Sequence, residues 1–399
     1  MQVSFFTALI IFTAISCNSN SSFTQQPLND SINGMANTDY PAAFTGQTRI
    51  ARVVTATPYK VEKLNNSLGR TWAIINFPGN RFLVTEKSGY MLLLDEEGQL
   101  LKKITGLPHV IDSGQGGLLD VALDPQFDKN QTVYWAFSEP TGELTTTAIA
   151  KGQLAEGDST IKNATVIFRA TPGIKSFFHY GSRLLFDKEG NLLVTMGERY
   201  SEREKAQSKK YGLGKIFRIT AEGKAAAGNP FIHDKEALPE VYTYGHRNPQ
   251  SLAMHPVTGD IWEAEFGPRG GDELNLIKPG LNYGWPVITY GIDYDGAKIG
   301  AAIQQKEGME QPVYYWDPVI SPSGMVFYTG NAIPEWTNNL FIASLSSTSL
   351  VRLIIENNKV AGEERLLKDR QERLRDVTEH NGMLYVVSDN GTVFRVSKK

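Results

Sequence analysis

The residues best suited to binding a ligand lie close together between Tyr244 and Pro286. This segment, YGHRNPQSLAMHPVTGDIWEAEFGPRGGDELNLIKPGLNYGWP, contains an Arg-Asn pair, a Gly-Pro-Arg-Gly-Gly turn, an acidic pair and a loop with Gly, Asn and Trp. A hydrophobic core needs few of these residue types. Glycine and proline at this density fix unusual backbone geometry, and loops held in this way commonly carry ligand-binding residues. The segment therefore predicts a ligand site built from loops.

A loosely repeated unit supplies the elements that would position these loops. Each copy is an apolar strand, a turn with Gly, Asp, Asn or Pro, and a second apolar strand, and the copies recur roughly every 45 to 75 residues. The six copies begin at Trp72, Leu118, Ser182, Gln250, Ser323 and Arg375. Repeats of this size predict an all-β fold, a six-bladed β-propeller of four-stranded antiparallel blades. Strands near residues 53–64 are expected to complete the last blade beside the C-terminal strands, which would remove exposed sheet edges.

Loops at one mouth of such a ring converge on its axis, so residues far apart in the sequence can share one pocket. Arg373 and Arg375 alternate along one strand and are expected to face the same way, which suits carboxylate binding. A charged strand face is the alternative for this pair. The candidates from corresponding loops of different blades are Gln115, His179, Arg247, Asn248, Gly267, Pro268, Arg373 and Arg375.

The N-terminal residues predict export from the cell. Residues 4–15, SFFTALIIFTAI, form an apolar run too short to span a bilayer, and Cys17 follows it closely. Residues 1–17 resemble a bacterial lipoprotein signal, with Cys17 as the lipidated first residue of the mature chain; an ordinary secretory signal cleaved nearby is the alternative. Residues 18–48 predict a flexible tether and residues 49–399 the propeller domain. The expected location is periplasmic, with a lipid anchor in a bacterial membrane.

The overall composition is that of a soluble globular protein, with 41% hydrophobic and 21% charged residues among 399. The net charge of −3 gives no indication of binding to nucleic acid or to an anionic membrane surface. Cys17 is the single cysteine, so the chain forms no intrachain disulfide.

Six motifs follow one another along the chain in a fixed order. They are GQGGLLDVALDP (114–125), HYGSRLLFD (179–187), YGHRNPQSLAMHP (244–256), EFGPRGGDELN (265–275), NYGWPVITYGIDYDG (282–296) and RLRDV (373–377). Together they resemble the soluble pyrroloquinoline quinone (PQQ)-dependent sugar dehydrogenases of the glucose/sorbosone dehydrogenase family, in particular its aldose sugar dehydrogenases. The resemblance covers about residues 50–397 and implies a six-bladed propeller.

The resemblance implies oxidation of the C1 hydroxyl of aldose sugars to lactones, with hydride transfer to PQQ and electron transfer to an external acceptor. PQQ is a flat tricarboxylate with an electrophilic quinone carbonyl, so its site needs cationic or amide donors and a base for the substrate hydroxyl. By resemblance, His179 is the general base and Glu198 orients it. Arg247 also stabilises the charge that develops at the quinone. The residues implied to contact PQQ are Gln115, Arg247, Asn248, Tyr294, Arg373 and Arg375.

Two calcium sites are implied as well. Carbonyl groups of Gly267 and Pro268 would hold the Ca²⁺ that bridges PQQ, since calcium accepts backbone oxygens and glycine permits a close approach. Glu273 and the backbone of Tyr283 would form a separate structural calcium site.

One position departs from the family pattern. Relatives place a lysine that pairs with PQQ after the strand LFIASL, where this chain has Ser346. The change removes a charge-assisted contact worth about 1.5–3 kcal/mol. Cofactor affinity could drop, another basic residue could substitute, or the site could hold a different ligand. The alternative function is a non-enzymatic propeller that binds a glycan or a protein partner; a calcium-dependent lactonase would need axial carboxylates.

Overall fold

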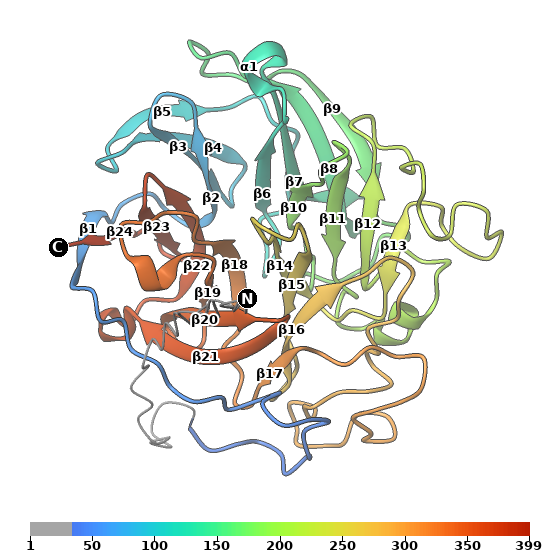
Figure 1. Ribbon diagram of the computed structural model, residues 1–399. Helices are drawn as coiled ribbons and strands as arrows, with labels where there is room; N and C mark the ends of the chain where they lie inside the picture. Colours follow the sequence, from blue (N-terminus) through green and yellow to red (C-terminus); the bar gives the residue numbers. More distant parts are fainter. Residues whose placement is uncertain (1–33) are drawn as a thin grey trace, which may run out of the picture.

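An antiparallel sheet of four strands is repeated six times around a central axis (Figure 1). The computed structural model of the chain describes residues 34–399. Each of the six sequence copies forms the first two strands of one sheet. The prediction of a six-bladed β-propeller with four-stranded antiparallel blades is therefore confirmed.

The blades follow the order of the chain, except that β1 belongs to the last one. Blade 1 contains β2 (Thr71–Phe77), β3 (Arg81–Glu86), β4 (Tyr90–Asp95) and β5 (Leu100–Ile104). Blade 2 contains β6 (Leu118–Leu123), β7 (Thr132–Thr141), β8 (Leu144–Gln153) and β9 (Lys162–Arg169). Blade 3 contains β10 (Leu184–Phe186), β11 (Leu192–Met196), β12 (Lys215–Ile219) and β13 (Val241–Tyr244).

Blade 4 contains β14 (Pro249–Met254), β15 (Ile261–Glu265), β16 (Asp272–Ile277) and β17 (Tyr314–Trp316). Blade 5 contains β18 (Pro322–Phe327), β19 (Leu340–Ser344), β20 (Ser349–Glu356) and β21 (Lys359–Leu366). Blade 6 contains β22 (Leu374–His380), β23 (Met383–Ser388), β24 (Val393–Lys398) and β1 (Tyr59–Asn65). The first strand of every blade lies nearest the axis, and these six strands contact one another in turn around the ring.

In the part of the chain that the structure describes, helical structure is limited to short turns between strands. The helices are α1 (Phe127–Asn130) and the 3-10 turns Arg203–Gln207, Pro334–Trp336 and Lys368–Arg370. Within residues 34–399, none of these helices has the length and apolar character needed to cross a membrane.

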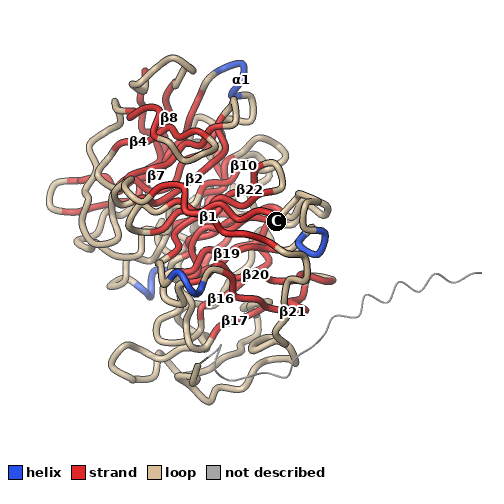
Figure 2. The backbone as a smooth tube through the Cα atoms, turned by 90° about the vertical axis from the view of Figure 1, so that its left-hand side faces the viewer, coloured by secondary structure: helices blue, strands red, loops and turns tan. Residues whose placement is uncertain are grey.

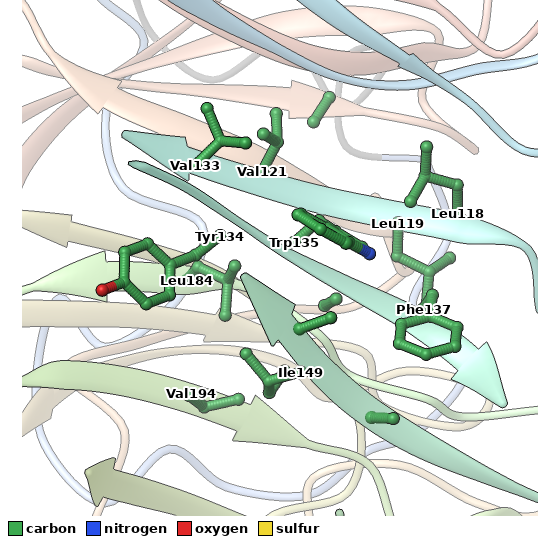
Figure 3. Packing of buried hydrophobic residues seen from close by; sticks show 14 of the residues in the cluster. Leu118, Leu119, Val121, Val133, Tyr134, Trp135, Phe137, Ile149, Leu184 and Val194 are labelled. Atoms are coloured by element: carbon green, nitrogen blue, oxygen red, sulfur yellow. The ribbon is translucent and has the colours of Figure 1, made fainter. Parts of the chain in front are cut away.

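Apolar residues on both faces of the strands are buried, because each blade packs between two neighbours. In β7, every residue from Val133 to Phe137 is buried. Trp135 packs in one cluster with Leu184 and Val194 of blade 3 (Figure 3). This packing fixes the inner ends of the strands, from which the loops of the site extend.

The ring closes through the pairing of β1 with β24, as predicted. Val61 lies opposite Val396 in an antiparallel register, and Figures 1 and 2 both show β1 beside the C-terminal end. Only part of the predicted segment joins this blade. Arg52 forms a parallel bridge with Glu363 of β21, and the N–H of Val53 donates to the carbonyl oxygen of Glu363 at 2.9 Å. The residues immediately before β1 therefore run along blade 5.

Residues 37–49 lie against blade 4, although most of them belong to the segment predicted as a tether. Asn37 and Thr38 donate four hydrogen bonds to the carboxylate of Asp317. The Nε2 atom of Gln47 donates to the carbonyl oxygen of Pro312 at 2.9 Å. This part of the predicted tether is thus attached to the propeller. Residues 18–33 of the predicted tether, together with the signal segment and Cys17, lie outside the described residues.

Candidate active site

His179 and Glu198 form a buried pair at the inner end of blade 3. His179 lies in the loop before β10 and Glu198 follows β11, so the antiparallel pairing of these strands brings them together. The Nδ1 atom of His179 is 3.0 Å from Oε1 of Glu198. Within residues 34–399, Nε2 of His179 makes no hydrogen bond. A carboxylate at Nδ1 holds the ring in the tautomer that leaves Nε2 able to accept a proton.

The surroundings of His179 favour its neutral form. Burial lowers the pKa of His179 below its usual value, and the guanidinium of Arg247 lowers it further, whereas Glu198 opposes both effects. Neutral imidazole is the form that acts as a general base. The site therefore holds His179 ready to remove a proton.

Three chain segments meet at Gly197 because this residue has no side chain. A Cβ atom at Gly197 would lie 2.2 Å from the carbonyl oxygen of His179 and 2.8 Å from Oδ1 of Asn248. The next residue, Glu198, donates its backbone N–H to the carbonyl oxygen of Arg247 at 2.9 Å. Glycine is required here so that His179, Glu198 and the Arg247-Asn248 pair can converge.

Gln115 and Asn248 fix the backbone around His179. Oε1 of Gln115 accepts the N–H of His179 at 2.7 Å, and Oδ1 of Asn248 accepts the N–H of Gly181 at 3.1 Å. His179 has a φ of 50°, in the left-handed region that costs a non-glycine residue about 1–3 kcal/mol. These hydrogen bonds hold the strained residue in place. Gln115 precedes β6 of blade 2 and Asn248 precedes β14 of blade 4. The two blades next to blade 3 therefore both hold the His179 loop in place.

The guanidinium of Arg247 lies between two aromatic rings. Its Cζ atom is 5.2 Å from the ring centroid of Trp285 and 5.9 Å from that of Tyr294. Nη2 donates to the hydroxyl of Tyr294 at 3.2 Å, and Nη1 donates to the carbonyl oxygen of Gly267 at 2.7 Å. These contacts hold a positive charge close to His179.

A cavity of about 410 Å³ opens at the axis next to Gln115. Four cationic side chains and two amides line it, with one carboxylate among them. Three of the residues that line the cavity, Gln115, Arg373 and Arg375, were predicted to bind a ligand. The other lining residues were not. The polar lining residues are Arg70, Lys87, Arg373, Arg375, Gln115, Gln250 and Asp389.

Arg373 and Arg375 do face the same way. The Nε atoms donate to the two carboxylate oxygens of Asp389, at 2.9 and 2.7 Å respectively. Burial alone would raise the pKa of Asp389, but the guanidinium groups of Arg375 and Arg373 outweigh it and hold this pKa below its usual value. Asp389 thereby fixes both arginines at the edge of the cavity.

The residues present fit an anionic ligand such as PQQ. Two buried donors at this end of the axis, Nε of Arg247 and Nδ2 of Asn248, have no partner among residues 34–399. A buried donor without a partner costs about 1–3 kcal/mol. An oxygen atom of a bound ligand that accepted hydrogen bonds from these two donors would remove that cost. Cationic side chains in excess of carboxylates suit a ligand with several carboxylates.

The first predicted calcium site lies in the turn between β15 and β16. A Cβ atom at Gly267 would lie 2.2 Å from the carbonyl oxygen of Gly271, so glycine allows the turn to close. The carbonyl oxygen of Gly267 accepts a hydrogen bond from Arg247 and retains a second lone pair for a cation. Pro268 borders a small cavity that Glu198 and Arg247 also line.

The second predicted calcium site lies at the boundary between blades 3 and 4. Oε2 of Glu273, on β16, is 3.4 Å from Nδ2 of Asn275. The ring of Tyr283 stacks on that of His246, with 4.7 Å between centroids. Burial raises the pKa of the nearby Glu263 carboxyl well above its usual value. Neither Glu263, which lies between two motifs, nor His246, which lies within the motif 244–256, was among the predicted site residues.

Ser346, the departure from the family pattern, points its hydroxyl at the protein backbone. Its Oγ atom donates to the carbonyl oxygen of Val319 at 3.2 Å. Blade 1 supplies cations to the same cavity from elsewhere. Nζ of Lys87 donates to the carbonyl oxygen of Gly114 at 2.9 Å, and Arg70 lies just before β2.

Some of the cavity-lining residues that were not predicted could have been found by aligning the repeats with one another. Trp72, Gln250 and Arg375 each begin a copy of the repeat and all three line the cavity. Lys87 lies within the first copy, in the turn after β3, and Arg70 lies just before that copy; no motif marks either residue. The fold and the site together define a propeller enzyme with its reactive groups at the axis.

Comparison with known proteins agrees with this assignment. The family model described as Glucose / Sorbosone dehydrogenase matches residues 68–395. The aldose sugar dehydrogenase YliI of Escherichia coli strain K12 is 38% identical over 345 residues, covering 85% of this chain and 93% of that relative. A crystal structure of a glucose dehydrogenase has a TM-score of 0.82 at 42% identity, covering 85% of this chain and 99% of that one.

A structure described as the PQQ-bound form of aldose sugar dehydrogenase from Streptomyces coelicolor is also similar. Its TM-score is 0.72 at 27% identity, and the match covers 87% of this chain and 100% of that one. Because the family model and the relatives match most of the chain, the protein belongs to the glucose/sorbosone dehydrogenase family.

Proposed function

We propose that the protein is a PQQ- and calcium-dependent dehydrogenase that oxidises the C1 hydroxyl of aldose sugars to lactones. The observation that carries this proposal is the buried His179–Glu198 pair, which the hydrogen bond from the N–H of His179 to Gln115 connects to a cation-lined cavity at the axis. The relatives named as aldose sugar dehydrogenases, one of them PQQ-bound, support it. When bound, PQQ supplies the quinone carbonyl that accepts a hydride, and the electrons leave for an external acceptor.

In this proposal, Nε2 of His179 takes the proton of the C1 hydroxyl as the hydride leaves the same carbon. The sugar thus loses one proton and one hydride and becomes the lactone. Glu198 holds the imidazole ring and stabilises the imidazolium that forms. Arg247 and Asn248 donate hydrogen bonds to the oxygen at which negative charge develops.

Other side chains would bind the cofactor and its ions. Gln115, Arg373 and Arg375 would hold PQQ carboxylates, and Tyr294 would lie at the cofactor edge. Calcium would be held by carbonyl oxygens of Gly267 and Pro268, and a structural calcium by Glu273 with Tyr283.

Lys87 is the residue that we propose replaces the cation missing at Ser346. It lines the cavity together with Leu345, which neighbours Ser346. We predict that Lys87→Met weakens PQQ binding about 10- to 100-fold, the equivalent of one charge-assisted hydrogen bond. Spectroscopic titration of apoprotein with PQQ measures this. Lys129→Met, in the exposed helix α1, is the control, and unchanged affinity in Lys87→Met would exclude the role.

Reconstitution tests the proposed function. Purified apoprotein given PQQ and Ca²⁺ is expected to reduce a dye when an aldose is added. His179→Ala should abolish turnover and still bind PQQ, whereas His233→Ala, at an exposed loop position, should behave as wild type. Absence of activity across a panel of aldoses after PQQ has demonstrably bound would refute the proposal. Turnover in His179→Ala would instead show that another residue is the base.

We also propose that the protein is exported and anchored through a lipid on Cys17. The support is the short apolar run followed by this cysteine. Expression of the full chain in a bacterium should give a membrane-bound protein whose N-terminal peptide carries a lipid by mass spectrometry. Cys17→Ser should release it from the membrane fraction, and a lipid-free wild-type N-terminus would contradict the proposal.

A further inference from the structure

A cluster of buried acidic and imidazole groups lies between blades 3 and 4, behind the Arg247-Asn248 pair. The ligand-capable atoms of His246, Glu263 and Glu265 all lie within 4.8 Å of one another. The three residues are buried, with 0%, 0% and 3% of their surfaces exposed. Glu263 and Glu265 stand on the same face of β15 because they are two residues apart on one strand.

The pairing of strands adds more negative charge to this cluster. Glu265 lies directly opposite Glu273 across β15 and β16, and Glu263 lies opposite Asn275. Like charges directly opposite each other destabilise a sheet. Among residues 34–399, no lysine or arginine side chain forms an ion pair with these carboxylates, and His246 is the one basic side chain within ion-pair distance of Glu265. Buried charges without a partner are strongly unfavourable, so the cluster calls for a cation.

Two oxygen atoms in the cluster lack partners. Oε1 of Glu263 and Oδ1 of Asn275 form no hydrogen bond within residues 34–399. Nδ2 of Asn275 lies 3.0 Å from Glu263, 3.5 Å from Glu265 and 3.4 Å from Glu273, more carboxylates than its two hydrogens can serve. The oxygen and nitrogen of an amide are interchangeable by rotation. The Asn275 side chain can therefore turn its oxygen towards a cation at the centre of the cluster.

His246 is arranged as a metal-bound histidine would be. Its Nδ1 atom is 3.3 Å from Oε1 of Glu265, and its Nε2 atom is 2.8 Å from the hydroxyl of Thr243. Metal-binding histidines commonly donate the other ring N–H to such an oxygen, which leaves the ligating nitrogen with its lone pair. The stacked ring of Tyr283 fixes the orientation of His246.

We propose that His246, Glu263 and Glu265, with Asn275 beside them, bind a divalent first-row transition metal such as Zn²⁺. Imidazole nitrogen with carboxylate oxygen suits this class of ion, whereas calcium takes oxygen ligands. The site differs in this from the calcium site proposed at Glu273 and Tyr283.

The bound metal would act on the active site through Glu265. Its Oε2 atom accepts the backbone N–H groups of Arg247 and Asn248, at 2.5 and 3.2 Å. Its Oε1 atom faces the cluster. A metal at Oε1 would fix the carboxylate that holds the backbone of this pair, so the ion has a positioning role.

The test uses the purified full-length apoprotein without PQQ or sugar, stripped of metal with a chelator. After one equivalent of Zn²⁺ and gel filtration, wild type is expected to retain about one ion by elemental analysis. Glu263→Gln and His246→Gln should retain at least tenfold less. Glu356→Gln, at an exposed strand end, is the matched control. Equal retention in wild type and both cluster variants, or none in wild type, would overturn the proposal.

Thermal unfolding distinguishes a metal site from a purely structural hydrogen-bond network. Without metal, Glu263→Gln should have a higher Tm than wild type, because glutamine removes the cost of keeping several carboxyl groups together in a buried cluster. With Zn²⁺ the order should reverse, because only wild type gains the ligand's stabilisation. A variant less stable in both conditions would overturn the proposal, as would stabilisation by Ca²⁺ alone that His246→Gln leaves unchanged. No step involves PQQ, so the result is independent of the proposed dehydrogenase activity.

Discussion

At the scale of single residues, the proposed mechanism depends on the protonation state of His179. Burial and Arg247 lower its pKa, and Glu198 is the one neighbour that raises it appreciably. A base with a lowered pKa stays neutral to a lower pH than free imidazole does. Activity at mildly acidic pH is therefore an expected property of the enzyme.

Replacement of Glu198 tests this balance. Glu198→Gln removes the anion that raises the pKa of His179, so the pKa falls further and the acid limb of the pH profile moves to lower pH. The turnover number should also fall, by about 10²-fold or more, because the imidazolium loses its partner. The pH dependence of kcat/KM measures both effects. Glu204→Gln, an exposed carboxylate in the following turn, is the control, and an acid limb that does not move would contradict the assignment.

At the scale of elements, Arg199 joins the end of β11 to the loop that carries His179. Its buried guanidinium donates to the carbonyl oxygens of Phe178 and Thr145, both at 2.9 Å. It also stacks on the ring of Tyr180, 3.9 Å from the centroid. Arg199 itself has a φ of 67°, so this strained residue and its hydrogen bonds hold one another in place.

Loss of this connection should loosen the His179 loop. We predict that Arg199→Met lowers both kcat and the free energy of unfolding, the latter by about 1.5–3 kcal/mol for the lost charged hydrogen bonds. Arg199→Lys keeps the charge but not the planar fork, and it should recover part of the stability. Chemical unfolding and steady-state kinetics check the two effects. A methionine variant with wild-type kcat would show that the loop does not depend on Arg199.

The elements were easier to predict from the sequence than the complete site. The strand-turn-strand copies that begin at Trp72 and Arg375 contain apolar strand residues and turn residues next to one another. The blades could therefore be predicted from local sequence alone. Lys87 reaches the cavity only because blade 1 stands opposite other blades across the axis. From the sequence alone, Glu263 is a polar residue on a predicted strand and would be expected to face solvent. It is buried only because blades 3 and 4 pack together, which the sequence does not show.

At the scale of the whole molecule, the ring depends on one seam between the two ends of the described chain. Strand β1 is the outer strand of a blade whose other three strands are the last in the sequence. Residues 37–49 add a second attachment, at Asp317 and along blade 4. The N-terminal part of the described chain thus stabilises blades that lie more than 250 residues further on.

Truncation separates these contributions. A chain that begins at residue 34 keeps all of the described contacts and is the reference. One that begins at residue 55 loses the contacts to Asp317, and its Tm should fall by a few degrees. One that begins at residue 66 also lacks β1 and leaves β24 as an open edge, so it should aggregate or unfold at a much lower temperature. Equal Tm values for the three chains, measured by calorimetry, would contradict this account.

The pairing of β1 with β24 also determines when the ring can close during synthesis. A ribosome produces β1 among the first strands and β24 as the last, and these two strands are partners. Blade 6 cannot be completed, and the ring stays open, until β24 has been made and has left the ribosome. A nascent chain arrested before residue 393 should accordingly be digested by protease at sites that the finished protein protects. Closure of the ring therefore requires that β24 has been made, and a copy terminated before β24 would remain an open ring that proteases can attack.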